Sequence, residues 1–141
     1  MLSIVDLIAA GTLPRPVALY ALAAIGAGAS FMVGARPGGA GKTTVMGALL
    51  NLTPPDVLLT TVADWDAIER GLREKTPRRC FVCHEIGPGP WYGYLWGSRL
   101  RRYFELPTVG HLLATNLHAD TVEEAREQIC EQNGVPIEAF Q

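Results

Sequence analysis

The segment RPGGAGKTT, residues 36–44, places glycines, a lysine and two hydroxyl side chains in a spacing that suits phosphate binding. Backbone amides in a tight glycine turn point into one hollow, and a helix that follows adds the positive end of its dipole. Lys42 would reach the β- and γ-phosphates of a nucleotide, and the Thr43 hydroxyl would bind Mg²⁺. Thr44 would support packing or contact the α-phosphate. The residues predicted to bind the nucleotide are Gly38, Gly39, Ala40, Gly41, Lys42, Thr43 and Thr44.

One position departs from the G-x-x-x-x-G-K-[ST] pattern, because Arg36 stands where the first glycine is expected. A positive φ at this position would strain an arginine by about 1 kcal/mol or more, whereas a negative φ would cost little. The side chain would either contact a phosphate or face solvent. The alternative to a nucleotide site is a glycine-rich turn followed by an exposed lysine.

A candidate catalytic carboxylate ends the apolar run CFVCHEIG, residues 80–87. In phosphate-loop ATPases a carboxylate at the end of a neighbouring strand supports Mg²⁺ or orients the attacking water. We therefore predict that Glu85 polarises water, while His84 stands where many families have aspartate. The alternative is a glutamate that simply leaves a strand into solvent.

The same residues spell C-x-x-C-H, which is the attachment pattern for c-type haem. A strand would direct Cys80 and Cys83 to opposite faces, which disfavours haem attachment, and no export signal precedes them. A closed zinc site needs four ligands, and only Cys80, Cys83 and His84 are local. We expect the cysteines to be small core residues.

The elements around these residues predict an α/β fold. Residues 3–10 favour a short helix capped by Ser3, and a second helix begins near Pro16 and ends in the glycines before Ser30. A helix after the phosphate loop ends before residues 53–55, and residues 120–134 form another, with Thr121 and Glu124 as a capping box. Four apolar runs separated by loops or helices predict buried parallel strands at SFMVGA, DVLLTTVA, RCFVCHE and HLLATNL.

Length and composition favour one domain, residues 1–141, with leading helices over 1–28 and a nucleotide-binding core over 29–141. The net charge of −2 gives no overall field for nucleic acid. Three cysteines and a poor signal sequence favour the cytoplasm. The charge-free run 17–33 is at the short limit for a membrane span, and its small residues fit a buried helix followed by a core strand better.

The segment GHLLATNLHAD, residues 110–120, places His111 at the start of a strand and His118 just after its end, where a side chain could contact a γ-phosphate. This segment resembles the histidine box of the type II/type IV secretion ATPases, RecA-like motors of secretion systems, pili and archaeal flagella. Other segments resemble the same family in the same order. Residues 6–55 are similar to its leading helices and Walker A segment, LLTTVADWD to its acidic box with Asp64, and LREKTPRRCFVCHEIG to its Walker B segment.

The resemblance implies a RecA-like, mostly parallel sheet flanked by helices and the hydrolysis of ATP with Mg²⁺. Glu85, His118 and Asp64 are then the catalytic residues, with Glu85 orienting water, His118 sensing the γ-phosphate and Asp64 organising Mg²⁺ or water. A homo-oligomeric ring, hexameric by resemblance, would supply an arginine from a neighbouring subunit. The resemblance also implies a secretion or pilus complex at the inner face of a membrane.

Several features depart from that family. The chain has almost nothing before the motor core, a short span between Asp64 and Glu85, an aromatic insertion GPGPWYGYLWG and few residues after His118. These departures keep two alternatives open. One is a nucleotide-binding switch or accessory protein that scarcely hydrolyses ATP, and the other is a small phosphate-loop kinase with residues 87–104 as its lid.

Overall fold

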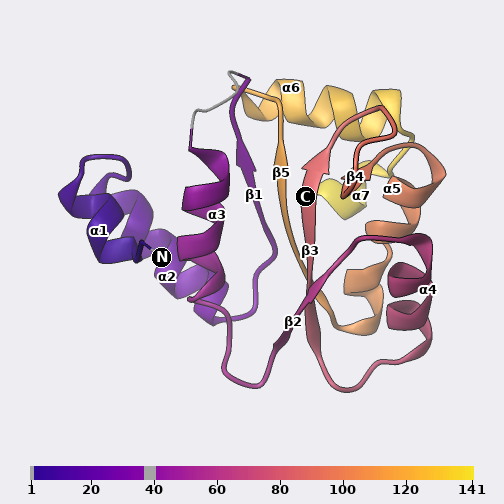
Figure 1. The fold of residues 1–141 in the computed structure, drawn as a ribbon, viewed down its shortest axis with the longest axis horizontal. Coiled ribbons are helices and arrows are strands. Elements are labelled where there is room, and N and C mark those ends of the chain that lie inside the picture. Colours follow the sequence, from indigo (N-terminus) through magenta and orange to yellow (C-terminus); the bar gives the residue numbers. More distant parts are fainter. Residues whose placement is uncertain (1, 37–40) are drawn as a thin grey trace.

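A parallel β-sheet forms the centre of the computed structural model, which describes residues 2–36 and 41–141. Its strands are ordered β1-β5-β3-β2, and β4 pairs with β3. Every pairing is parallel. The predicted α/β class with parallel strands is therefore confirmed, and the carboxyl ends of the strands meet at one edge, the upper edge in Figure 1.

Four of the five strands in the described part of the chain lie at the predicted runs, and β4 is an additional one. The strands are β1 (Phe31–Gly34), β2 (Leu58–Thr61), β3 (Arg79–Ile86), β4 (Tyr94–Leu95) and β5 (Leu112–Leu117). The helices are α1 (Ile4–Ala9), α2 (Arg15–Gly26), α3 (Lys42–Leu50), α4 (Trp65–Arg73), α5 (Ser98–Tyr103), η1 (Leu106–Val109), α6 (Val122–Arg126), η2 (Glu127–Gln132) and α7 (Ile137–Phe140).

Helices cover the two faces of the sheet unequally. On one face, α3 packs against β1 and β5, with α1 and α2 outside it (Figure 1). The other face carries the larger core, in which Phe81 and Cys83 of β3 pack with Ile68 of α4 and Leu100 of α5. Period-two alternation turns Cys80 to the smaller core instead. The prediction that Cys80 and Cys83 face opposite sides is confirmed.

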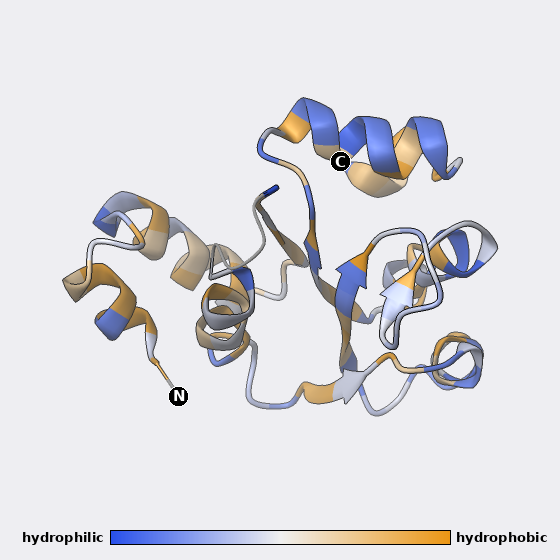
Figure 2. Ribbon diagram, turned by 45° about the horizontal axis from the view of Figure 1, so that its top comes forward, coloured by the Kyte–Doolittle hydropathy of each residue, from blue (hydrophilic) through white to orange (hydrophobic). Residues whose placement is uncertain are grey.

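The prediction of a buried helix within residues 17–33 is wrong. α2 buries only Ala18 and Ile25, while Leu19 and Tyr20 are exposed. Figure 2 colours the leading helices mostly as hydrophobic, so apolar character alone does not bury them. The helix packs on α1 and α3 and makes no strong contact with the sheet, so most of its surface meets solvent. Within the described residues, no helix has both the length and the apolar character needed to cross a bilayer.

Three strands differ from expectation. β1 was predicted to be buried, but it is an edge strand whose residues are alternately half-buried and exposed. β2 was predicted to be buried, but it is an edge strand in which Leu58 and Leu59 are about half exposed. β4 was not predicted, because its two residues lie within the aromatic insertion and have no alternating run around them. They pair with Glu85 and Ile86 at the end of β3, so this insertion extends the sheet.

The helix over residues 120–134 begins as predicted, because the Thr121 side chain accepts a hydrogen bond from the amide of Glu124. The reciprocal half of the box differs from expectation. The Glu124 carboxylate accepts from the amide of Asp120, one residue before the cap. After Arg126 the helix widens into the π-helical segment η2 and ends before Gly134, whose φ is 75°.

Candidate nucleotide site

Three side chains from separate elements meet at the carboxyl edge of the sheet. Lys42 opens α3, Glu85 lies near the end of β3 and His118 follows β5. Lys42 Nζ lies 2.9 Å from Glu85 Oε1 and 3.4 Å from the carbonyl oxygen of Leu117. His118 Nε2 lies 3.5 Å from the same Glu85 oxygen. The order β1-β5-β3 makes this meeting possible, since each residue follows or ends one of three adjacent strands.

The Lys42–Glu85 pair is buried, with side chains only 10% and 7% exposed. Desolvating two charges is costly, and such a pair is weak support for stability. In addition, Glu85 Oε2 is buried and has no hydrogen-bond partner in the described part of the chain. A buried carboxylate oxygen without a donor is an acceptor available to a water molecule or a cation.

The residues predicted to form a phosphate loop lie only partly within the described part of the chain. Gly38, Gly39 and Ala40 were predicted to bind the nucleotide, and they lie outside the described residues. Gly41 caps α3 with a φ of 89°, a conformation that favours glycine. Thr43 and Thr44 lie exposed in the first turn of α3, beside the positive end of its dipole.

Arg36 is unstrained, because no described residue other than glycine has a positive φ. Of the two conformations considered for Arg36, it therefore has the one with negative φ, which costs little. Its side chain is 62% exposed and pairs with Glu124 of α6, which raises the pKa of the guanidinium through a hydrogen bond and the charge of that carboxylate.

The site would accommodate Mg²⁺ in the way this ion usually binds. Mg²⁺ keeps several waters and takes one or two protein ligands together with substrate phosphates. The Thr43 hydroxyl and the free oxygen of Glu85 are suitable donors, directly or through water. Among the described residues, no group of three or more histidine, cysteine or acidic side chains is placed to hold a metal by itself.

Asp64, predicted to be catalytic, lies away from this cluster. It precedes α4 after the edge strand β2, is exposed, and accepts a hydrogen bond from the amide of Ala67 at 2.9 Å. Within the described chain it makes no hydrogen bond to Lys42, Glu85 or His118. Its observed role is that of a helix cap.

His111 lies at the opposite edge of the sheet from Lys42. It is 3% exposed, and its Nδ1 accepts from the amide of Arg79 at 3.1 Å. Its Nε2 then carries the proton and lies 2.9 Å from the Gly71 carbonyl and 3.0 Å from that of Glu74. The ring ties the start of β3 to the end of α4, so His111 has a structural role.

Cys80 and Cys83 are fully buried and free. Burial raises the pKa of each thiol to about 11. Because a thiolate is the reactive and metal-binding form, neither thiol is activated at neutral pH. The prediction that they are small core residues is confirmed.

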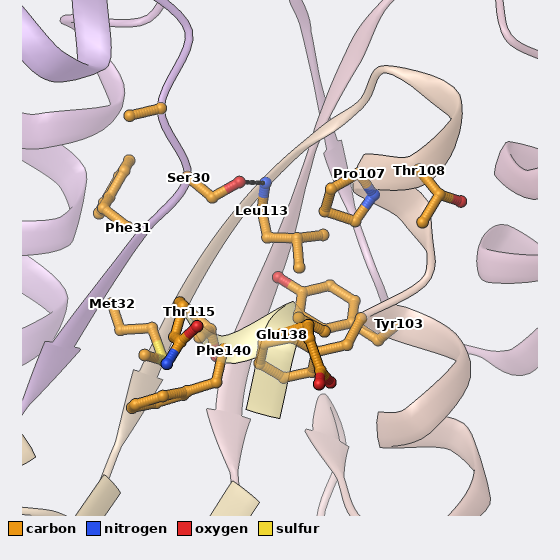
Figure 3. Close-up of a pocket in the computed structure, with 14 residues that line it drawn as sticks. Ser30, Phe31, Met32, Tyr103, Pro107, Thr108, Leu113, Thr115, Glu138 and Phe140 are labelled. Atoms are coloured by element: carbon orange, nitrogen blue, oxygen red, sulfur yellow. Dashed lines mark hydrogen bonds between the residues drawn. The ribbon is translucent and has the colours of Figure 1, made fainter. Parts of the chain in front are cut away.

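A cavity of about 620 Å³ lies elsewhere, between β1, β5, η1 and the C-terminal residues (Figure 3). Three of its polar side chains already have partners. Ser30 Oγ accepts from the amide of Leu113, Thr115 Oγ1 donates to the carbonyl of Asn116, and the Tyr103 hydroxyl lies 2.7 Å from the carbonyl of Phe81. The cavity contains none of the predicted site residues.

Sequence reasoning missed Asp120 and the loop-holding role of Glu124. Asp120 Oδ1 accepts from the amide of Arg36 at 2.9 Å, and Glu124 Oε2 accepts from its guanidinium. Glu124 was assigned only to a capping box, and its position in a first helical turn gave no indication of a partner 88 residues away.

No family model matches the chain. A search of curated proteins finds no match either. The function is therefore argued from the geometry of Lys42, Glu85 and His118.

Proposed function

We propose that this protein binds ATP with Mg²⁺ at the carboxyl edge of its sheet and hydrolyses it, as a phosphate-loop ATPase similar to secretion motors. Lys42 and the loop amides hold the phosphates, and Thr43 binds Mg²⁺. Glu85 orients the attacking water and His118 contacts the γ-phosphate. Catalysis of this kind consists of positioning and charge stabilisation.

The observation that carries the proposal is the buried Lys42–Glu85 pair with its unpartnered Glu85 Oε2. A pair that served stability alone would be expected to have both carboxylate oxygens satisfied. Here a lysine at the start of a nine-residue helix faces a carboxylate that retains an acceptor. Phosphate oxygens would replace Glu85 as partners of Lys42. The Glu85 carboxylate would then be free to accept a hydrogen bond from the attacking water.

The proposed oligomeric state follows from the resemblance to secretion ATPases. Arg36 is paired with Glu124, and Arg102 is paired with Glu69 and Glu105. By the resemblance to secretion ATPases, an arginine from a neighbouring copy would complete the site in a homo-oligomeric ring. Attachment to a secretion or pilus complex at a membrane is the further expectation from that resemblance.

The test measures nucleotide binding and phosphate release with Mg²⁺-ATP over a range of protein concentrations. Lys42→Ala and Glu85→Gln are compared with the wild type, and circular dichroism checks that each variant is folded. Lys75→Ala is the matched control, because Lys75 is the other lysine of the chain and lies exposed between α4 and β3.

We expect Lys42→Ala to lose nucleotide affinity and Glu85→Gln to keep affinity but lose turnover by about 100-fold or more, the scale of general-base effects. Lys75→Ala should match the wild type. Specific activity that rises with protein concentration supports the ring. Failure of the wild type to bind nucleotide, or equal binding by Lys42→Ala, would contradict the proposal.

A second candidate is a nucleotide-binding switch with little turnover, and the position of Asp64 favours it. Asp64 caps α4 and leaves Glu85 as the one carboxylate of the predicted catalytic set in contact with Lys42. Tight ATP binding without phosphate release would identify this function.

The kinase alternative is less favoured, because β4 lies within the segment expected to be the lid. In the same segment, Arg101 donates to the carbonyl of Asn133, and Arg102 pairs with Glu69 and Glu105.

A further inference from the structure

Arg36 is held by three contacts although its side chain is largely exposed. Its amide donates to Asp120 Oδ1 at 2.9 Å, its Nε donates to Glu124 Oε2 at 2.5 Å, and its carbonyl accepts from His118 Nδ1 at 3.0 Å. All three partners lie within residues 118–124, which directly follow β5. The residue that departs from the phosphate-loop pattern is thus tied to the segment that follows β5.

The two carboxylates support each other. Glu124 Oε2, which binds the Arg36 guanidinium, also accepts from the amide of Asp120 at 3.3 Å. Asp120 in turn holds the Arg36 backbone. Glu124 is itself fixed, since its amide donates to Thr121 Oγ1 in the first turn of α6. We call Arg36, Asp120 and Glu124 the loop clasp.

The loop clasp determines the orientation of the His118 ring. The Arg36 carbonyl only accepts, so His118 Nδ1 must carry a proton to make this bond. Lys42 approaches the same nitrogen to 3.4 Å, and an ammonium group cannot donate to a protonated nitrogen. The two contacts are thus alternatives, and the shorter distance, 3.0 Å against 3.4 Å, assigns Nδ1 to the Arg36 carbonyl. Nε2 then faces Glu85 and the interior of the site.

We propose that Asp120 and Glu124 are positioning residues that act through Arg36 to aim His118 Nε2 at the γ-phosphate, to which Nε2 donates when the ring carries a second proton. This inference rests on the proposed function, in which His118 contacts that group. An arginine replaces the usual glycine because its side chain supplies the link to α6. The loop clasp therefore affects the affinity for ATP more than that for ADP, which lacks the γ-phosphate.

The test compares the affinities of ATP and ADP, by calorimetry with Mg²⁺, in the wild type, Glu124→Ala, Glu124→Gln and Glu123→Ala. Glu123 is the matched control, because it carries the same charge in the same helical turn and is exposed. A ¹⁵N spectrum of the imidazole of His118, recorded without nucleotide, reports which ring nitrogen carries the proton. Circular dichroism confirms folding.

We expect Glu124→Ala to lose ATP affinity by about tenfold, the scale of one hydrogen bond to a charged group, with ADP affinity changed less than about twofold. Glu124→Gln should fall between the wild type and Glu124→Ala, and Glu123→Ala should match the wild type. Equal losses for ATP and ADP, or no loss for ATP, would overturn the inference.

The imidazole spectrum separates this inference from the proposed function. If the wild type binds neither nucleotide, the proposed function fails, and with it the assignment of His118 to the γ-phosphate. The imidazole spectrum then tests whether the loop clasp orients His118, independently of nucleotide binding. A proton on Nδ1 in the wild type that is lost or redistributed in Glu124→Ala supports the link through Arg36, and identical spectra refute it. If Glu124→Ala does not fold, Glu124→Gln provides both readouts.

Discussion

His111 and His118 have different roles because they lie at opposite ends of β5. His111 satisfies one amide and faces two carbonyls in a buried setting, and its ring packs edge-on against Phe81 at 5.1 Å. The side chain of His118 is 45% exposed, beside the Lys42–Glu85 pair. The resemblance to a histidine box grouped the two residues in one motif. Their surroundings indicate that His111 stabilises the fold and that His118 belongs to the candidate site.

Substitution of each histidine should therefore affect a different property. His111→Ala leaves buried backbone groups without partners and should lower the free energy of unfolding by about 3 kcal/mol. His118→Ala removes an exposed ring and should change that free energy by less than about 0.5 kcal/mol while weakening ATP binding. Urea unfolding and nucleotide titration of both variants test this. Equal destabilisation by the two substitutions would contradict it.

At the scale of the elements, α4 approaches the sheet closely because Gly71 has no side chain. A Cβ at Gly71 would clash with the ring of Phe81 and lie 3.0 Å from Leu106 Cδ2. Phe81 is 1% exposed and its ring has no room to move. The helix therefore tolerates a residue of poor helix propensity in order to pack against β3.

Two glycine-to-alanine substitutions measure this close approach. Gly71→Ala should lower the free energy of unfolding by about 2 kcal/mol, since overpacking exceeds the gain in helix propensity. Gly47 is the control, because it lies within α3 and a Cβ there meets no atom within 4 Å. Gly47→Ala should raise the free energy of unfolding by about 0.5–1 kcal/mol. Urea unfolding checks both, and equal effects of the two substitutions would be inconsistent with the packing described.

The elements differ in how well the sequence predicts them. β5 and β3 are buried apolar runs bounded by clear breaks, so their positions and parallel direction follow from the residues. α2 misleads because its lack of charge suggests a buried helix, whereas burial depends on which neighbour covers it. β4 has only two residues, and they form a strand only because they pair with β3, so no local pattern predicts it.

At the scale of the molecule, the candidate site depends on strand order. Lys42, Glu85 and His118 are 33 to 76 positions apart from one another, and the order β1-β5-β3 brings them together. Motifs indicated these three residues. The contacts of Asp120 and Glu124 with Arg36 depend on how α6 turns after β5, and no local pattern encodes that angle. The same strand order places Asp64 after the edge strand β2, on the other side of β3 from β5 and β1.

The fold also predicts unequal stability across the molecule. β5 lies between β1 and β3 and all six of its residues are buried. In contrast, α1 and α2 pack on each other and on α3, and bury only Leu7, Ala18 and Ile25. Segments with few buried apolar contacts open locally at lower free energy than the core. We expect amide exchange over residues 3–26 to occur well before exchange in β5.

Hydrogen exchange with mass spectrometry, comparing the wild type with Leu7→Ala, tests this order. Leu7 is 2% exposed, and its truncation should cost about 2–4 kcal/mol of local packing. Because α1 and α2 can open while the sheet stays closed, Leu7→Ala should speed exchange in residues 3–26 and leave β3 and β5 unchanged. Faster exchange in β5 by the same factor would mean that the leading helices and the sheet unfold as one unit. Their packing on α3 would then contribute to holding Lys42 against Glu85.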